Sequence, residues 1–390
     1  MISNHLPQPL AARHDYGEAE AAMVEYREAG TRRAHELGNR GRIRFTNANE
    51  LHPSIREAYS RCGFYVFEGV LPEQELAEIE QDVAEILRRA PISRDSMVDC
   101  EGRPALGTDC KARTMSWVKP LSDPIGGTQA AHGRHPSRMT ELDPPRDAPK
   151  EIVQVISGAL QFSEAYLRVY GHPELLRVAE AIHGPDFTPF NEVLWVKHPG
   201  LGGSVAWHQD GWTHWDKPEL DENTHGFNFM AQLYGCDAEN GLWVVPGSHR
   251  RGRADIKELV RRAGSDRLPE AVPLICSPGD VAMTNRQAIH GSFANTSSKY
   301  RVTLNFGFHR RSSVLNVESG GVHNPVSIYT DEYIRSRSRL IMFGINARQK
   351  RFPKEPRYVY QPMSGCESDY LWDSSRMTEL KDYNLQDIGI

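Results

Sequence analysis

Apolar residues in the N-terminal part of the chain are spaced in a way that predicts a strand followed by a helix. Residues 63–70 are rich in aromatic and β-branched side chains, which favour a strand. Pro72 stands where a helix can begin. Beyond it, apolar residues recur at a spacing of three to four: Leu76, Ile79, Val83, Ile86 and Leu87. We therefore expect an amphipathic helix that packs on a sheet.

Two other stretches are predicted to be helical. Residues 16–37 are highly charged and carry few apolar anchors, so they form an arm that either packs on the core or is partly mobile. Residues 150–182 are also expected to be helical, with Gly184 and Pro185 as the stop.

From Asn191 onward the pattern changes to short strands separated by turn residues. We place eight strands near 191–198, 204–209, 226–234, 242–245, 272–276, 280–284, 287–292 and 301–309. A helix is inserted at 254–263. Eight short strands predict a mainly β fold with flanking helices, built on a double-stranded β-helix core of the jelly-roll, cupin-like kind.

The pattern divides the chain into three parts. Residues 1–45 form the N-terminal helical arm, 46–315 the jelly-roll domain, and 316–390 a C-terminal extension packed on the core or at an interface. The domain contains a polar, Gly- and Pro-rich insertion at 91–149. Long irregular segments in compact domains are usually functional or mobile, so we place it over the mouth of an active site. A surface insertion without a catalytic role is the alternative.

Composition narrows the possible functions. Hydrophobic residues make up 39% and charged residues 25% of the 390-residue chain, as in ordinary globular proteins. A net charge of −5 gives no electrostatic case for nucleic acid or an anionic membrane. The sequence has no apolar run long enough to span a bilayer and no N-terminal signal-peptide pattern. Six scattered cysteines without a Cys-x-x-Cys pair suit reduced thiols in a cytoplasmic protein.

One triplet carries the most chemical information. His208 and Asp210 are two residues apart at the end of an expected strand, so their side chains point to the same face. A third ligand from a distant strand, His290, can then complete two histidines and one carboxylate, the facial triad that binds Fe(II) and leaves positions open. Such triplets also arise by chance in a chain with 16 histidines and 51 acidic residues, so context has to decide.

That context resembles the phytanoyl-CoA dioxygenase family of Fe(II)- and 2-oxoglutarate-dependent oxygenases. The similar blocks, together covering roughly residues 60 to 310, are 63–71, 207–211, 240–249, 277–283, 289–292 and 300–301. The resemblance implies that His208, Asp210 and His290 bind Fe(II), and that Arg301 and Ser292 bind 2-oxoglutarate, with O2 as the other cosubstrate. Related halogenases replace the carboxylate with a small residue, so Asp210 favours oxygenation.

The chemistry of arginine suits the role that the resemblance gives to Arg301. A guanidinium is planar, permanently charged and bidentate toward a carboxylate. A snorkelling arginine at a strand end is the alternative. His249 lies in a turn after Pro246 and Gly247, and we expect it to be structural or to contact a metal ligand rather than to bind metal itself.

The substrate is less well defined by the sequence. Trp212, His214 and Trp215 directly follow the metal ligands and could line the mouth for an apolar or ring-bearing substrate, or the tryptophans could instead pack against the insertion. Trp243 is expected in the core. Three arginines could meet an anionic group such as a CoA phosphate, or could simply be solvated: Arg250, Arg251 and Arg253.

The predicted function is hydroxylation of an unactivated C–H bond of a small metabolite by a monomer or homodimer, without nucleic acid or membrane as partner. The same oxidant could also desaturate, epimerise or close a ring. A non-catalytic jelly-roll binding protein would not need all four of His208, Asp210, His290 and Arg301. A zinc hydrolase would lack a positioned general base and leave Arg301 unexplained.

Overall fold

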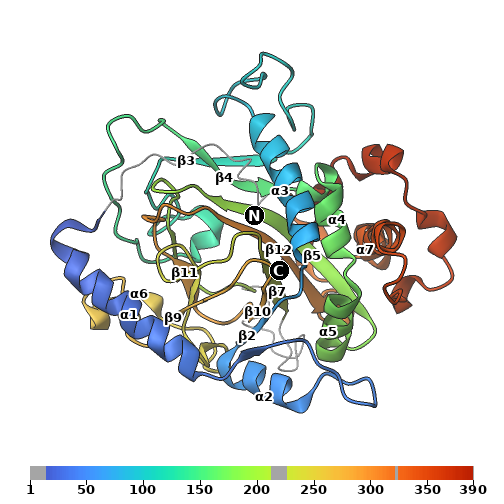
Figure 1. Ribbon diagram of the computed structural model, residues 1–390, viewed down its shortest axis with the longest axis horizontal. Helices are drawn as coiled ribbons and strands as arrows, with labels where there is room; N and C mark the ends of the chain where they lie inside the picture. Colours follow the sequence, from blue (N-terminus) through green and yellow to red (C-terminus); the bar gives the residue numbers. More distant parts are fainter. Residues whose placement is uncertain (1–14, 212–225, 321–323, 390) are drawn as a thin grey trace.

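The computed structural model describes residues 15–211, 226–320 and 324–389, which fold around two facing β-sheets (Figure 1). The larger sheet contains β1 (Arg40–Gly41), β2 (Phe64–Phe67), β3 (Met115–Val118), β4 (Ile152–Ser157), β5 (Phe187–Lys197), β7 (Phe227–Gln232), β10 (Val281–Asn285) and β12 (Arg301–Arg310). The smaller sheet contains β6 (Val205–His208), β8 (Trp243–Val244), β9 (Val272–Pro273) and β11 (His290–Ser292). A separate hairpin pairs β13 (Glu318–Ser319) with β14 (Ser327–Ile328).

The strand order is that of a jelly roll. The larger sheet runs β1-β2-β10-β7-β12-β5-β4-β3 and the smaller one β6-β11-β8-β9. One apolar cluster takes residues from both sheets, including Val66, Met230 and Ala282 from the larger and Val244 and Val272 from the smaller. The predicted fold class is therefore confirmed, and all eight strands expected after Asn191 are present.

Helices cover the outside of the larger sheet and flank the smaller one (Figure 1). The α-helices are α1 (Glu20–Glu36), α2 (Pro53–Cys62), α3 (Glu73–Arg88), α4 (Glu164–Tyr170), α5 (Pro173–His183), α6 (Ile256–Ala263) and α7 (Asp331–Arg351). Short 3₁₀ segments are η1 (Gly17–Ala19), η2 (Ala130–Gly133), η3 (Ala159–Gln161), η6 (Ser248–Arg250), η7 (Arg311–Ser313), η8 (Gln361–Met363), η9 (Glu367–Tyr370), η10 (Ser374–Leu380) and η11 (Tyr383–Gln386). The helices expected over 16–37, after Pro72 and over 254–263 are confirmed.

The expected helix over 150–182 is wrong in its first part. Residues Ile152–Ser157 form β4, which pairs with both β3 and β5. The segment is rich in β-branched residues, and it is buried on both faces, so the alternation that marks a half-exposed strand is missing. The rest of the stretch is helical, and Gly184 ends α5 with a φ of 85° as expected.

The N-terminal helix packs on the smaller sheet. The Tyr26 ring stacks on the Trp243 ring, with centroids 4.4 Å apart and planes 9° apart. Gly30 allows this close approach, because a Cβ there would lie 2.6 Å from atoms of the Trp243 ring. Trp243 is fully buried, so its expected place in the core is confirmed.

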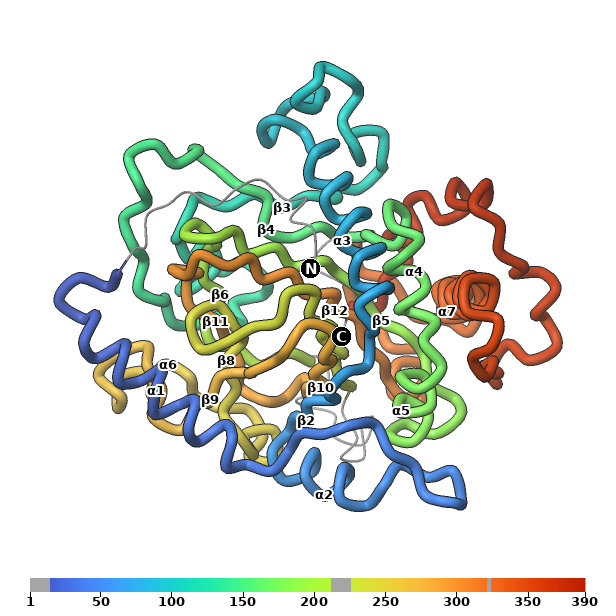
Figure 2. Tube along the Cα trace, in the orientation of Figure 1, coloured from blue at the N-terminus to red at the C-terminus, as the bar shows by residue number. Residues whose placement is uncertain are grey.

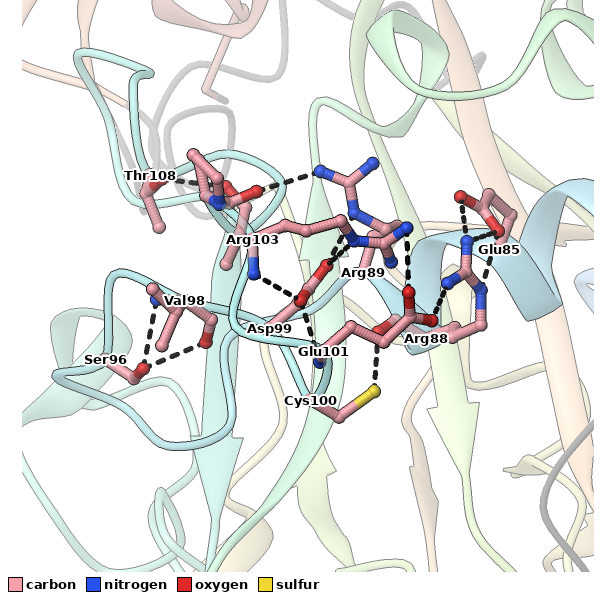
Figure 3. A network of polar contacts seen from close by, with 12 residues as sticks. Glu85, Arg88, Arg89, Ser96, Val98, Asp99, Cys100, Glu101, Arg103 and Thr108 are labelled. Carbon is pink, nitrogen blue, oxygen red and sulfur yellow. Dashed lines mark hydrogen bonds and ion pairs between the residues drawn. The ribbon is translucent and has the colours of Figure 1, made fainter.

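The first part of the insertion is tied to the end of α3 by a polar network. Figure 3 shows the Asp99 carboxylate accepting hydrogen bonds from Arg89 Nε at 2.7 Å and from Arg103 Nε at 3.0 Å. The backbone amides of Glu101 and Arg103 also donate to Asp99 Oδ1. A buried carboxylate with several donors fixes this turn, although the segment has little regular structure.

The C-terminal extension packs on the helical layer. Helix α7 lies against α4 and β5 (Figure 2). Its Arg348 donates to the fully buried Glu75 of α3, with Nη1 and Oε1 2.7 Å apart. Its Arg337, also fully buried, donates to Asp387 Oδ1 at 2.8 Å and to Tyr170 Oη at 3.2 Å. The divisions of the chain near residues 45 and 315 stay predictions.

Replacing Arg337 should destabilise the fold strongly. Arg337→Met leaves the buried Asp387 without its partner, and breaking a buried ion pair in this way costs about 3–5 kcal/mol. Urea unfolding should show this loss, and Asp387→Leu added to Arg337→Met should recover a large part of it. Arg261→Met, which removes an arginine that is 72% exposed and paired with Glu258, is the control and should leave the midpoint unchanged. Equal midpoints for the two single variants would contradict the expectation.

Candidate metal centre

Three side chains converge where β6 meets β11. The two strands are antiparallel, and His290 at the start of β11 lies directly opposite His208 at the end of β6. Asp210 follows two residues later. Its Oδ1 lies 3.8 Å from His208 Nε2, and its Oδ2 lies 3.9 Å from His290 Nε2. All three ligand atoms lie within 4.8 Å of one another, so the residues predicted from the sequence form one candidate metal site.

Backbone carbonyls set the orientation of both imidazole rings. His208 Nδ1 lies 2.9 Å from Ala206 O, and His290 Nδ1 lies 2.9 Å from Ala288 O. Because a carbonyl can only accept, each Nδ1 carries the hydrogen and each Nε2 presents its lone pair to the centre. Such a hydrogen bond on the far nitrogen fixes the tautomer that a metal ligand needs.

The electrostatics keep His208 and Asp210 in their ligand forms. Burial lowers the pKa of His208 well below its ordinary value. For Asp210, burial acts to raise the pKa, but the charges of Arg134 and Arg286 act against it, and the pKa is held well below its usual range. A neutral imidazole and an ionised carboxylate are the states that bind a divalent cation.

The insertion contributes two residues to this centre. Arg134 Nη1 donates to Asp210 Oδ1 at 2.6 Å. The His135 ring lies against the His208 ring, with centroids 4.0 Å apart, and burial lowers the pKa of His135 to about 4. Residues 131–133 before them all have positive φ, of 50°, 59° and 68°. Left-handed backbone costs roughly 1–2 kcal/mol per non-glycine residue, so surrounding contacts must hold this turn.

Buried carboxylates supply such contacts. The fully buried Asp123 accepts from the amides of Gly126 at 2.9 Å and Met139 at 2.8 Å. Asp266 accepts from the amide of Thr140 at 2.6 Å. Asp123 therefore closes the segment around Arg134 within the insertion, and Asp266 ties the end of that segment to the rest of the protein, beside the candidate metal centre.

A second cluster brings two cations together beside β11. Arg301 begins β12 and pairs in register with Lys197, the last residue of β5. Arg301 Nη1 donates to Asn240 O at 3.2 Å, and its buried Nε has no partner. Lys197 Nζ donates to Ser292 Oγ at 2.8 Å and to the carbonyl of Phe293. In the described chain, neither cation forms an ion pair.

Both cations pay a desolvation cost in this cluster. Burial lowers the pKa of Arg301 to about 10. Burial and the nearby Arg301 lower the pKa of Lys197 well below its ordinary value. An anion bound here would relieve both groups, so Arg301, Lys197 and Ser292 fit a carboxylate.

Other sequence candidates have different outcomes. Trp212, His214 and Trp215 lie outside the described residues. His249 is structural, since its Nε2 lies 3.1 Å from Ser60 O and its ring packs against Gly63.

Arg250, Arg251 and Arg253 lie at two different surface sites. Arg250 and Arg251 line a surface pocket with Leu37 and Arg61. Arg253 instead lines a cleft together with Arg134 and Gln209.

The sequence reasoning did not find Lys197, Arg134 or His135. Lys197 had a usable signal, because a lysine at the end of a strand of largely apolar character is unusual. Arg134 and His135 lie in an irregular segment that offers no periodicity from which to place them.

Comparisons with known proteins extend these observations. A family model described as phytanoyl-CoA dioxygenase (PhyH) matches residues 59–303, more than half of the 390-residue chain. The chain is similar to phytanoyl-CoA dioxygenase 1 of Oryza sativa subsp. japonica, with 32% identity over 116 residues that cover 28% of this chain but only 40% of the rice protein. Dioxygenase lolE1 of Epichloe uncinata is 23% identical over 210 residues, covering 52% of this chain and 73% of that one. The crystal structure of EctD from S. alaskensis with 2-oxoglutarate and 5-hydroxyectoine has 19% identity and a TM-score of 0.48, covering 70% of this chain and 81% of that one.

Removing His290 should abolish tight metal binding. We expect His290→Ala to weaken Fe(II) binding by more than about 100-fold, since loss of even an outer partner of a metal ligand costs roughly 10–100-fold. Anaerobic Fe(II) titration and metal content after dialysis measure this. His249→Ala is the matched control and should bind as wild type does. Weak Fe(II) binding by His249→Ala together with wild-type binding by His290→Ala would show that His249, and not His290, is the metal ligand.

Proposed function

Since the chain belongs to the phytanoyl-CoA dioxygenase family of non-haem iron, 2-oxoglutarate-dependent oxygenases, we propose that it hydroxylates an unactivated C–H bond of a small metabolite. Succinate and CO2 are the coproducts. The observation that carries the proposal is the convergence of His208, Asp210 and His290 within 4.8 Å, with both Nε2 atoms presented to one point. Retention of Asp210 supports oxygenation rather than halogenation.

In this proposal His208, Asp210 and His290 hold Fe(II). Bound there, the metal supplies the redox chemistry that couples O2 to decarboxylation of 2-oxoglutarate. Three protein ligands on one side leave the opposite side for 2-oxoglutarate and O2. Arg134 orients Asp210 by holding its Oδ1, which directs the carboxylate without adding a fourth protein ligand.

Arg301, Lys197 and Ser292 would hold the far carboxylate of 2-oxoglutarate. Their support is the pairing of two buried cations with no acidic partner among the described residues. A carboxylate there gains charge-assisted hydrogen bonds in a site closed to water, where such bonds are strongest. The carbonyl of Asn240 accepts from Arg301 Nη1 at 3.2 Å and helps to fix the guanidinium.

We also propose a reducing, cytoplasmic setting. All six cysteines are free thiols in the structure, and Fe(II) persists only where reductants are available. Among the described helices, none has the length and apolar character needed to cross a bilayer. A monomer or homodimer acting on a small molecule remains our expectation.

Succinate formation tests the activity. Purified chain is loaded anaerobically with Fe(II) and 2-oxoglutarate, exposed to O2, and assayed with and without a panel of candidate metabolites. Wild type should form succinate, even slowly without substrate, and Asp210→Ala should not. Asp147→Ala, an exposed carboxylate of the same insertion, is the control and should match wild type. Iron-dependent 2-oxoglutarate binding without succinate under any condition would instead indicate a binding protein.

The role of Arg301 can be tested by equilibrium binding. Arg301→Ala should weaken anaerobic 2-oxoglutarate binding to the Fe(II)-loaded chain by roughly 10- to 100-fold, because a charged hydrogen bond contributes about 1.5–3 kcal/mol. The 2-oxoglutarate affinity of Arg301→Lys should lie between those of wild type and Arg301→Ala, because lysine keeps the charge but loses the bidentate geometry. Lys299→Ala removes an exposed cation of the same segment and should have no effect. Unchanged affinity in Arg301→Ala would remove this residue from the site.

A further inference from the structure

A cleft opens beside the metal centre between the insertion and the start of α6. Its cavity volume is about 520 Å³. It is lined by residues 132–134 and Pro136 of the insertion, by Gln209, and by residues 253–257. We call this the basic cleft. This volume lies within the range of roughly 300–1,000 Å³ that is usual for small-molecule sites.

The charges that line the basic cleft are mostly positive. Arg134, Arg253 and Lys257 all contribute to it, and Asp255 is the one acid among its described lining residues. The Asp255 carboxylate caps α6, because its Oδ1 accepts from the amide of Glu258 at 3.0 Å, and it keeps its negative charge. Arg253 and Lys257 have no ion-pair partner within the described part of the chain. The described lining residues therefore carry a net positive charge.

The basic cleft is physically joined to the metal centre. Arg134 lines the cleft and donates to the predicted iron ligand Asp210 at 2.6 Å. Gln209 lies between His208 and Asp210 in sequence, and its side chain holds the opposite wall. Its Nε2 donates to Gly252 O at 3.2 Å, and its Oε1 accepts from the amide of Ala254 at 2.9 Å. The wall carrying Arg253 is thus fixed to the segment that carries the ligands.

A charge count shows what the loaded centre would lack. Fe(II), Asp210, a 2-oxoglutarate dianion, Arg301 and Lys197 together leave one positive charge. Arg134, which pairs with Asp210, and the lining residues Arg253 and Lys257 add further positive charge, against the one carboxylate of Asp255 among the described lining residues. Positive charge beside a cation is unfavourable unless an anion joins it, and a cleft with low-dielectric walls focuses this field.

We propose that the basic cleft binds an anionic group of the substrate, a carboxylate or a phosphate, and so orients the rest of the molecule toward the metal. This inference rests on the proposed oxygenase function. Arg253 and Lys257 make the outer contact and Arg134 the inner one. The substrate class is then a small metabolite with an acidic handle on one side of the carbon that is oxidised.

Binding of small anions tests the proposal. The full chain, loaded anaerobically with Fe(II) and 2-oxoglutarate, is titrated calorimetrically with benzoate, phenyl phosphate and the neutral benzamide. At least one anion should bind at least tenfold more tightly than benzamide, and the preferred anion distinguishes a carboxylate from a phosphate site. The double variant Arg253→Ala/Lys257→Ala should lose at least tenfold of that affinity, which corresponds to about 1.4 kcal/mol.

A matched variant separates local recognition from net charge. Arg250→Ala/Arg251→Ala removes two positive charges from the same loop but lines a different pocket, and it should keep wild-type anion affinity. Equal losses in the two double variants, or no preference for either anion over benzamide, would overturn the proposal. Iron-dependent 2-oxoglutarate binding is measured in the same samples. If it persists while anion preference is absent, the basic cleft is misassigned and the oxygenase function stands; if it is absent, the function itself fails.

Discussion

The register between β6 and β11 is the constraint on which the candidate site depends. Because side chains alternate faces along a strand, a slip of one residue would turn His290 away from His208 and Asp210. Several buried contacts hold this register. Trp207 Nε1 donates to Asp266 O at 2.7 Å, and the amide of Asp210 donates to Arg286 O at 2.8 Å. Gly291 contributes by its size, since a Cβ there would lie 3.0 Å from Val205 O. The metal centre is therefore a product of sheet pairing, and the insertion is added to it.

Several features of the candidate site are unfavourable for the stability of the protein. Lys197 and Arg301 are buried with hydrogen bonds to neutral acceptors, and neither forms an ion pair among the described residues. The turn at 131–133 holds three successive residues in the left-handed region. Each feature lowers the stability of the ligand-free protein, and in the proposed function each is offset when anions and a metal occupy the centre. The stabilising contacts lie elsewhere, in the apolar cluster between the sheets and in the helical layer around α7.

The sequence was most informative where the regular alternation of side chains along a strand determines which way they point. The turn residues between strands predicted the jelly roll, and the two-residue spacing of His208 and Asp210 predicted two side chains on one face, which the structure brings together with His290. Arg301 was accessible because the family resemblance places it after His290. The periodicity failed at β4, where burial of both faces removes the alternation. It could offer nothing for Arg134 and His135, whose positions depend on tertiary anchors at Asp123 and Asp266, far from the ligands in sequence.

The ion pair between Glu75 and Arg348 has a consequence for synthesis of the chain. Glu75 lies on α3 and Arg348 on α7, the last α-helix, and the two residues are 273 positions apart in the sequence. Burial raises the pKa of Glu75, and Arg348, with a smaller contribution from Arg168, offsets that effect. At roughly 5–20 residues per second, a ribosome needs on the order of a quarter of a minute to one minute to make the intervening segment. During that interval α3 carries an acid that lacks its main partner, so the helical layer can reach its native packing only when nearly the whole chain has left the ribosome.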